Sequence, residues 1–266
     1  MKLYRIAEDQ NSNSYDPYDR VYENMLHKIR RIITSRNYTE KFLNNDKKSS
    51  ILFTPRFDKN KKNILIIAGQ HGEEIAGPYG LLKFLNDNPK LLEQVNISFV
   101  PVVNVHGFEN NIRNGTDDTY TNFFLNEDRS IRELGYEAQG LLNHLDLLGY
   151  CAKDGLINLH EDSTAEGFYL YVLGDNESSI VQNMLRVGKE FFEFKRDGNY
   201  SDNDDYELKN GVISNHPDKS FDDLMKSKFH IELVVTIETP QVDAKIPKRA
   251  EAISAMTSAY IQGIIK

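Results

Sequence analysis

The sequence contains one cysteine, no tryptophan and no long apolar run. Because Cys151 has no partner in the chain, an intrachain disulfide and a thiolate cluster are excluded, and a metal site has to use histidine and carboxylate ligands. No apolar segment approaches the about 20 residues of a membrane-spanning helix. The N-terminal residues also lack the apolar core of a secretory signal. We therefore expect a cytoplasmic protein without a membrane partner.

Basic residues are in the minority. The 266 residues include 32 Lys and Arg against 40 Asp and Glu, which gives a formal net charge of -8. Nucleic-acid binding needs a basic patch, and the sequence shows no such cluster. The sequence also lacks a G-x-S-x-G elbow, a Walker loop and a G-x-G-x-x-G motif. These absences argue against nucleic-acid partners and against the enzyme classes that use those motifs.

Short apolar runs alternate with amphipathic segments beyond Lys61. Near-continuous apolar runs are typical of strands that are buried on both faces of a sheet. The pattern predicts an α/β fold with a parallel or mixed sheet flanked by helices. We predict strands at 64–69, 97–105, 156–160, 168–174 and 231–239, helices at 75–85, 131–148, 179–192 and 247–264, and long polar loops at 109–128 and 196–210.

The domain organisation follows from length and hydrophobic content. With 39% hydrophobic residues, the chain can bury a large core, and we predict a single catalytic domain over residues 1–266. Apolar residues recur near helical spacing at 18–33, within an otherwise polar segment. Residues 1–50 are therefore predicted to form a helical N-terminal extension that packs on the domain.

Histidines and carboxylates follow directly after four predicted strands. Ligands of open α/β sheets bind beyond the carboxyl ends of strands, so these side chains are expected to meet at one edge. They are His71 and Glu74 after the first strand, His106 after the second, His160, Glu161 and Asp162 after the third, and Glu238 at the end of the last.

Two His-Glu pairs have the spacing of a metal site. His71 and Glu74 can reach one ion if the residues between them turn, and Gly72 and Gly77 would supply the backbone freedom for a strand-to-helix turn. His106 and Glu109 have the same spacing. The amphipathic segment after His71 would fix Glu74 in a first helical turn, whereas Glu109 opens into a polar loop, so the first pair is favoured.

A third ligand has to come from elsewhere in the chain, because catalytic zinc usually has three protein ligands and one water. His160 is the favoured third ligand because Glu161 and Asp162 follow it and could orient its ring. His106 is the alternative, and either histidine could instead have an ordinary structural role.

Two further residues could take part in the chemistry. Glu238 is the predicted general base, because a carboxyl group at the end of an apolar strand has a raised pKa. Arg113, in a predicted loop, could polarise a carbonyl or bind a substrate carboxylate. A capping role for Glu238 and a solvated loop position for Arg113 are the ordinary alternatives.

Five sequence blocks, taken in order, resemble the zinc carboxypeptidase superfamily. This superfamily includes the murein-peptide amidases and the succinylglutamate desuccinylase/aspartoacylase branch. The resemblance implies a mixed, twisted sheet of about eight strands flanked by helices, a phosphorylase/hydrolase-like fold, and one catalytic Zn²⁺ per chain. The blocks are GQHGEEIAG, PVVNVHGFENNIRNG, FFLNEDRS, INLHEDSTAEGFYLY and VVTIETP.

The resemblance also assigns roles by position. His71, Glu74 and His160 match the zinc ligands, Glu238 matches the general base, and Arg113 matches the arginine that polarises the scissile carbonyl.

The family's substrate-binding Asn-Arg pair is matched only in part. Asn126 fits the asparagine, but Arg129 lies two residues further along than the family's arginine. We predict that Asn126 and Arg129 bind substrate together with Arg113 and Asn114. His106 stands where many members carry aspartate, so the resemblance implies that it is a loop residue.

These features predict a zinc-dependent metallocarboxypeptidase or amidase that hydrolyses an amide bond in a small peptide with a free carboxylate. The first alternative is an N-acyl amino acid deacylase of the succinylglutamate desuccinylase/aspartoacylase kind, which would share the metal core. The second is a non-catalytic protein that binds a carboxylated ligand.

Overall fold

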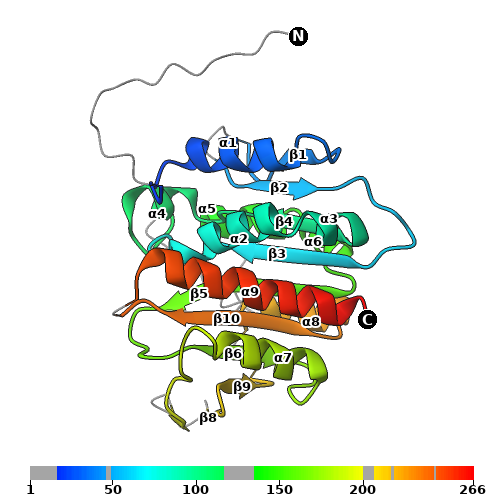
Figure 1. The fold of residues 1–266 in the computed structure, drawn as a ribbon. Helices are drawn as coiled ribbons and strands as arrows, with labels where there is room; N and C mark the ends of the chain where they lie inside the picture. The colour runs from blue at the N-terminus through cyan, green and yellow to red at the C-terminus, as the bar shows by residue number, and fades with distance from the viewer. Residues whose placement is uncertain (1–16, 46–48, 117–134, 200–206, 217–218, 243) are drawn as a thin grey trace.

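One mixed β-sheet lies between two layers of helices in the computed structural model (Figure 1). The structure describes residues 17–45, 49–116, 135–199, 207–216, 219–242 and 244–266. The strand order across the sheet is β1-β2-β4-β3-β5-β10-β6-β9-β8-β7. The central strands β4, β3, β5 and β10 are parallel, and β2 and β6 pair with them in antiparallel orientation. The predicted α/β fold class is confirmed.

The element bounds define the layers. The strands are β1 (Thr39–Phe42), β2 (Ile51–Thr54), β3 (Asn63–Ala68), β4 (Asn96–Val100), β5 (Gly155–Asp162), β6 (Tyr169–Leu173), β7 (Gly198–Asn199), β8 (Glu207–Lys209), β9 (Val212–Ser214) and β10 (Val234–Pro240). The helices are α1 (Tyr22–Ile33), α2 (Ala76–Asp87), α3 (Pro89–Gln94), α4 (Val105–Asn110), α5 (Tyr136–Leu142), α6 (Leu145–Cys151), α7 (Ser179–Gly188), α8 (Phe221–Phe229) and α9 (Ile246–Ile264).

Within the described residues the sheet has ten strands, whereas about eight were expected from the resemblance. Strand β1 is exposed along its whole length, and β7 and β8 have only two and three residues. Such strands carry no continuous apolar run and little alternation, so hydrophobic patterning does not reveal them. β7 and β8 lie in the segment that was predicted to be a loop.

The N-terminal segment is not helical throughout. Helix α1 packs on the main core, and β1 follows it and joins the edge of the sheet. The segment is thus integrated into the fold through both elements. The side chains that α1 buries are Tyr22, Met25, Leu26, Ile29 and Ile33.

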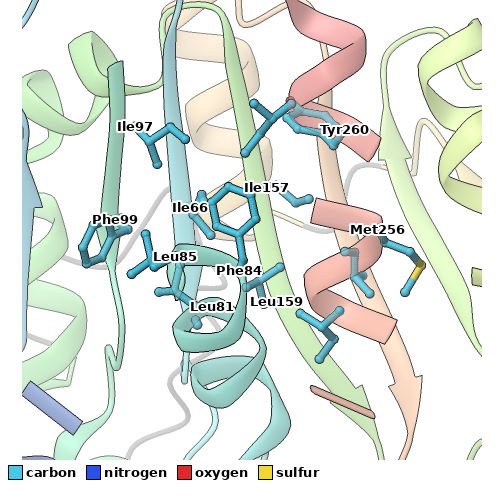
Figure 2. Close-up of a cluster of buried hydrophobic side chains, with 14 of the residues drawn as sticks. Ile66, Leu81, Phe84, Leu85, Ile97, Phe99, Ile157, Leu159, Met256 and Tyr260 are labelled. Atoms are coloured by element: carbon cyan, nitrogen blue, oxygen red, sulfur yellow. The ribbon is translucent and has the colours of Figure 1, made fainter. Parts of the chain in front are cut away.

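Two hydrophobic cores cover the two faces of the sheet. Alternate residues of β3 belong to different cores: Ile66 lies in the first and Ile67 in the second, which explains the continuous apolar run. In the first core, Phe84 of α2 and Tyr260 of α9 pack over the strands (Figure 2). The free thiol of Cys151 is buried in the second. Among the described helices, none combines the length and apolar character that a membrane crossing requires.

Two predicted elements differ from the structure. Strand β4 ends at Val100 rather than at 105, because Pro101 has no N–H to continue the ladder. Helix α4 follows, and the Asn104 carboxamide accepts a hydrogen bond from Gly107 N at 2.7 Å near its start. The single helix predicted at 131–148 is divided into α5 and α6 in its described part.

Candidate metal and catalytic site

A pocket of about 410 Å³ lies at the carboxyl ends of β3, β5 and β10. Because side chains alternate along a strand, every second residue of β5, β10 and β6 faces this pocket. Glu238 of β10 lies opposite His160 of β5 in the ladder, and Thr236 lies opposite Asn158. The sheet residues that line the pocket include Asn158, His160, Tyr169, Tyr171, Thr236 and Glu238.

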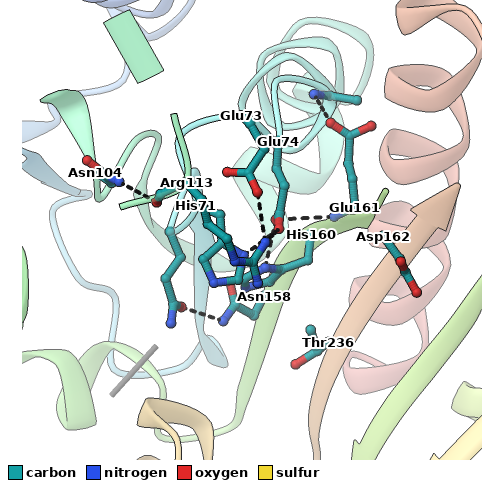
Figure 3. Close-up of polar contacts among 12 residues, drawn as sticks. His71, Glu73, Glu74, Asn104, Arg113, Asn158, His160, Glu161, Asp162 and Thr236 are labelled. Carbon is teal, nitrogen blue, oxygen red and sulfur yellow. Dashed lines mark hydrogen bonds and ion pairs between the residues drawn. The ribbon is translucent and has the colours of Figure 1, made fainter. Parts of the chain in front are cut away.

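His71, Glu74 and His160 lie together although they come from distant segments (Figure 3). The Glu74 carboxylate lies between the two histidines: its Oε1 contacts His71 Nδ1, and its Oε2 is 2.8 Å from His160 Nδ1. All three side chains are buried, and the candidate ligand atoms lie within 4.8 Å of one another. His106 is exposed on α4, so the alternative pair with Glu109 is not part of this group.

This group fits a divalent cation. His160 Nδ1 is buried, and its close contact with Glu74 lacks the geometry of a hydrogen bond. Burial raises the pKa of Glu74, but His71 and His160 outweigh it and hold this pKa below its ordinary value. Burial lowers the pKa of His160, whereas Glu74 raises it, to about 9. The site therefore favours positive charge between the three side chains, and nitrogen and oxygen ligands of this kind suit Zn²⁺.

The loop between β3 and α2 is tightly packed. A Cβ atom at Gly72 would lie 2.0 Å from the carbonyl carbon of Gly107. Neither Gly72 nor Gly77 has a positive φ, so the expected need for backbone freedom at these two positions is wrong. A Cβ at Gly77 would meet the Leu159 carbonyl oxygen at 2.6 Å. Both Gly72 and Gly77 serve close packing.

Glu161 connects Glu74 to helices α2 and α9. Its backbone N–H donates to Glu74 Oε2 at 3.2 Å, and its carboxylate accepts from Ala76 N at 2.7 Å, where α2 begins. The guanidinium of Arg249, in α9, donates to the same carboxylate. Burial raises the pKa of Glu161 to about 7, although Arg249 opposes the rise. This buried pair connects α9, α2 and β5 to the candidate ligand Glu74.

The two acidic residues after His160 do not orient its ring through the contacts that the structure describes. The Glu161 carboxylate bonds α2 and α9, as above. Asp162 instead accepts hydrogen bonds from Tyr169 Oη at 3.0 Å and from Lys195 Nζ at 2.8 Å. In the described contacts these two carboxylates do not orient the ring of His160, although this was expected. They hold the surrounding helices, strands and loops in place instead.

Glu238 is part-buried and faces the pocket beside His160. Burial raises the pKa of its carboxyl group to about 8, while the positive charge of His160 opposes this rise. A carboxyl group whose pKa lies in this range can accept and release a proton near neutral pH. Its position and its pKa both suit a general base.

Arg113 also lines the pocket. Its Nη1 donates to Glu73 Oε1 at 2.8 Å and to Glu74 Oε1 at 3.2 Å, and its side chain is 39% exposed. Its guanidinium is therefore held beside the candidate ligand Glu74 and still reaches solvent.

The other predicted substrate-binding residues are placed differently. Asn114 is not among the residues that line the pocket, and its backbone carbonyl accepts a hydrogen bond from Asn104 Nδ2 at 3.0 Å. Asn126 and Arg129 lie outside the described residues.

Asp222 of α8 is a pocket residue that the sequence did not reveal. Its carboxylate accepts hydrogen bonds from Thr236 Oγ1 at 2.6 Å and from Asn158 Nδ2 at 3.2 Å. Thr236 and Asn158 precede Glu238 and His160 by two residues, so strand alternation could have identified them. Asp222 comes from a helix, and no strand period points to it.

Comparisons with known proteins support a zinc-dependent metallopeptidase. A family model described as zinc carboxypeptidase (Peptidase M14) matches residues 42–122. No curated protein matches the sequence.

Several solved structures are similar to this chain. A candidate metallopeptidase from Shewanella baltica OS155 is 27% identical, with 91% of this chain and 92% of that chain covered and a TM-score of 0.82. One from Shewanella denitrificans OS217 is 26% identical, with 91% and 90% covered and a TM-score of 0.80. A metallo-carboxypeptidase from Pseudomonas aeruginosa, in complex with (2-guanidinoethylmercapto)succinic acid, is 16% identical, with 92% and 69% covered and a TM-score of 0.61. The last similarity shows the fold alone.

Proposed function

Since this chain is a zinc-dependent hydrolase that resembles the zinc carboxypeptidases, we propose that it hydrolyses an amide bond in a small peptide with a free carboxylate. One observation carries this proposal: the group of His71, Glu74 and His160 shares a pocket with the carboxyl group of Glu238. A metal site with an adjacent proton acceptor is the arrangement that amide hydrolysis by water requires.

We assign His71, Glu74 and His160 as the ligands of one Zn²⁺ per chain. When bound, the ion supplies a Lewis acid that polarises a carbonyl group and lowers the pKa of a water molecule. Glu161 and its partner Arg249 hold the backbone behind these ligands.

Glu238 is the proposed general base. Its carboxylate accepts a proton from the attacking water and then donates this proton to the leaving amine. Arg113 stabilises the negative charge that develops on the carbonyl oxygen, because its guanidinium lies at the pocket beside Glu74. The free carboxylate of the substrate is proposed to bind Arg113, Asn114, Asn126 and Arg129.

A matched set of substrates tests the proposal. We would compare blocked dipeptides that end in a free carboxylate with the same peptides ending in an amide, and with N-acyl amino acids. The proposal predicts turnover of the free-acid peptides and little turnover of the amides. Preference for N-acyl amino acids would favour the deacylase alternative, and absence of all turnover by zinc-loaded protein would favour a binding protein.

The cytoplasmic location stays a prediction.

A further inference from the structure

Arg20, in the segment before α1, contacts the loop between β3 and α2. Its Nη1 donates to the carbonyl oxygen of Gly72 at 2.7 Å and to that of Phe108 at 3.2 Å, and its Nη2 donates to that of Glu73 at 2.9 Å. Gly72 and Glu73 are the two residues between the ligands that this loop contributes. One guanidinium therefore holds the backbone of the metal-binding loop.

Neighbouring contacts fix Arg20 in this position. The Tyr79 hydroxyl of α2 donates to the carbonyl oxygen of Asp19 at 2.7 Å, and Lys28 Nζ lies 3.5 Å from the Asp19 carboxylate. The guanidinium also lies 5.8 Å from the centre of the Phe108 ring. The segment before α1 is thus anchored on α2 and α4 at once.

The other contacts of the loop leave it little freedom to compensate. Gly72 packs directly against Gly107 of α4, where even a Cβ atom has no room. Removing the guanidinium would leave carbonyl groups of the loop without their donor, and a polar group that is shielded from water and loses its partner is costly. The loop would relax, and the two ligands that flank these carbonyls would lose their orientation.

We propose that Arg20 is a positioning residue for the metal site, through which the N-terminal segment sets the affinity for zinc. This inference rests on the proposed zinc ligands. Arg20 is not among the residues that line the pocket, so it acts through the loop and does not touch substrate. The planar fork of arginine reaches three carbonyl groups in fixed directions, which the single ammonium group of lysine cannot reproduce.

The test compares zinc affinity among four proteins: the wild type, Arg20→Ala, Arg20→Lys and Arg31→Ala. Arg31 is an exposed arginine of α1 and serves as the matched control. Competition with a chromophoric chelator gives each dissociation constant. We expect Arg20→Ala to weaken zinc binding by about tenfold or more, as for other residues that orient metal ligands. The zinc affinity of Arg20→Lys should lie between those of Arg20→Ala and the wild type, and the zinc affinity of Arg31→Ala should equal that of the wild type.

Two further measurements separate positioning from general stability. Urea unfolding of the zinc-free proteins shows how much folded protein each variant retains. Guanidinium ion at millimolar concentration should restore part of the zinc affinity of Arg20→Ala and leave the wild type unchanged. Equal zinc affinity in Arg20→Ala and the wild type would overturn the inference. A loss of zinc affinity that parallels the loss of folded protein, and that guanidinium ion does not reverse, would also overturn it. A wild type that binds no zinc would instead reject the zinc site itself.

Discussion

Replacing Glu238 by glutamine is expected to reduce kcat by about 100-fold or more while zinc content stays unchanged, because the variant keeps the shape of the side chain and loses the proton acceptor. Glu238 lies opposite His160 in the ladder but is not among the three clustered side chains that are proposed to bind zinc. Steady-state kinetics with a peptide substrate, together with elemental analysis, measure both quantities.

The control for this variant is Glu232→Gln, the same change at an exposed position just before β10, which should leave kcat unaltered.

The pH profile adds a second test. A base acts when it is deprotonated, and burial raises the pKa of Glu238 to about 8. A bound cation lowers this pKa, so wild-type kcat/KM should rise with pH over a range below 8. Turnover that is retained in Glu238→Gln would contradict the assignment of Glu238 as the general base.

Replacing Arg249 by methionine is expected to destabilise the protein by about 3–5 kcal/mol, because the change leaves Glu161 buried without its positive partner. Both side chains are buried, with 9% of Arg249 and 0% of Glu161 exposed. Urea unfolding of the zinc-free protein measures the change in the free energy of unfolding.

A double variant identifies the cause of this loss. Glu161→Gln combined with Arg249→Met removes both charges, so it should recover a large part of the stability that Arg249→Met loses. Lys248→Met, an exposed position next to Arg249, is the control and should change stability by about 0.5 kcal/mol or less. A loss below about 1 kcal/mol in Arg249→Met would show that the buried pair contributes little.

The central strands and the clustering of His71, Glu74 and His160 could be predicted from the sequence because their signals are local. Continuous apolar runs located β3, β4, β5, β6 and β10. The ends of these strands pointed to four side chains that share one pocket in the structure: His71, Glu74, His160 and Glu238. Parallel strands bring their carboxyl ends to one edge, so sequence order was sufficient to group them.

Other features depend on contacts between distant segments. Arg20, Asp222 and Arg249 each come from outside the strand ends, and no local pattern distinguishes them from ordinary surface residues. Helix α4 was missed because its apolar residues continue the run that begins in β4, and only Pro101 marks the boundary. The substrate-binding roles of Asn126 and Arg129 stay predictions.

Metal content shows whether His71, Glu74 and His160 hold one zinc ion, as proposed. We would measure zinc by elemental analysis in wild type, His71→Ala and His160→Ala, with the exposed His106→Ala as control. We expect about one zinc per chain in wild type and His106→Ala, and loss of this zinc in the other two variants. Zinc that survives both ligand substitutions, or a wild type without zinc, would contradict the proposal.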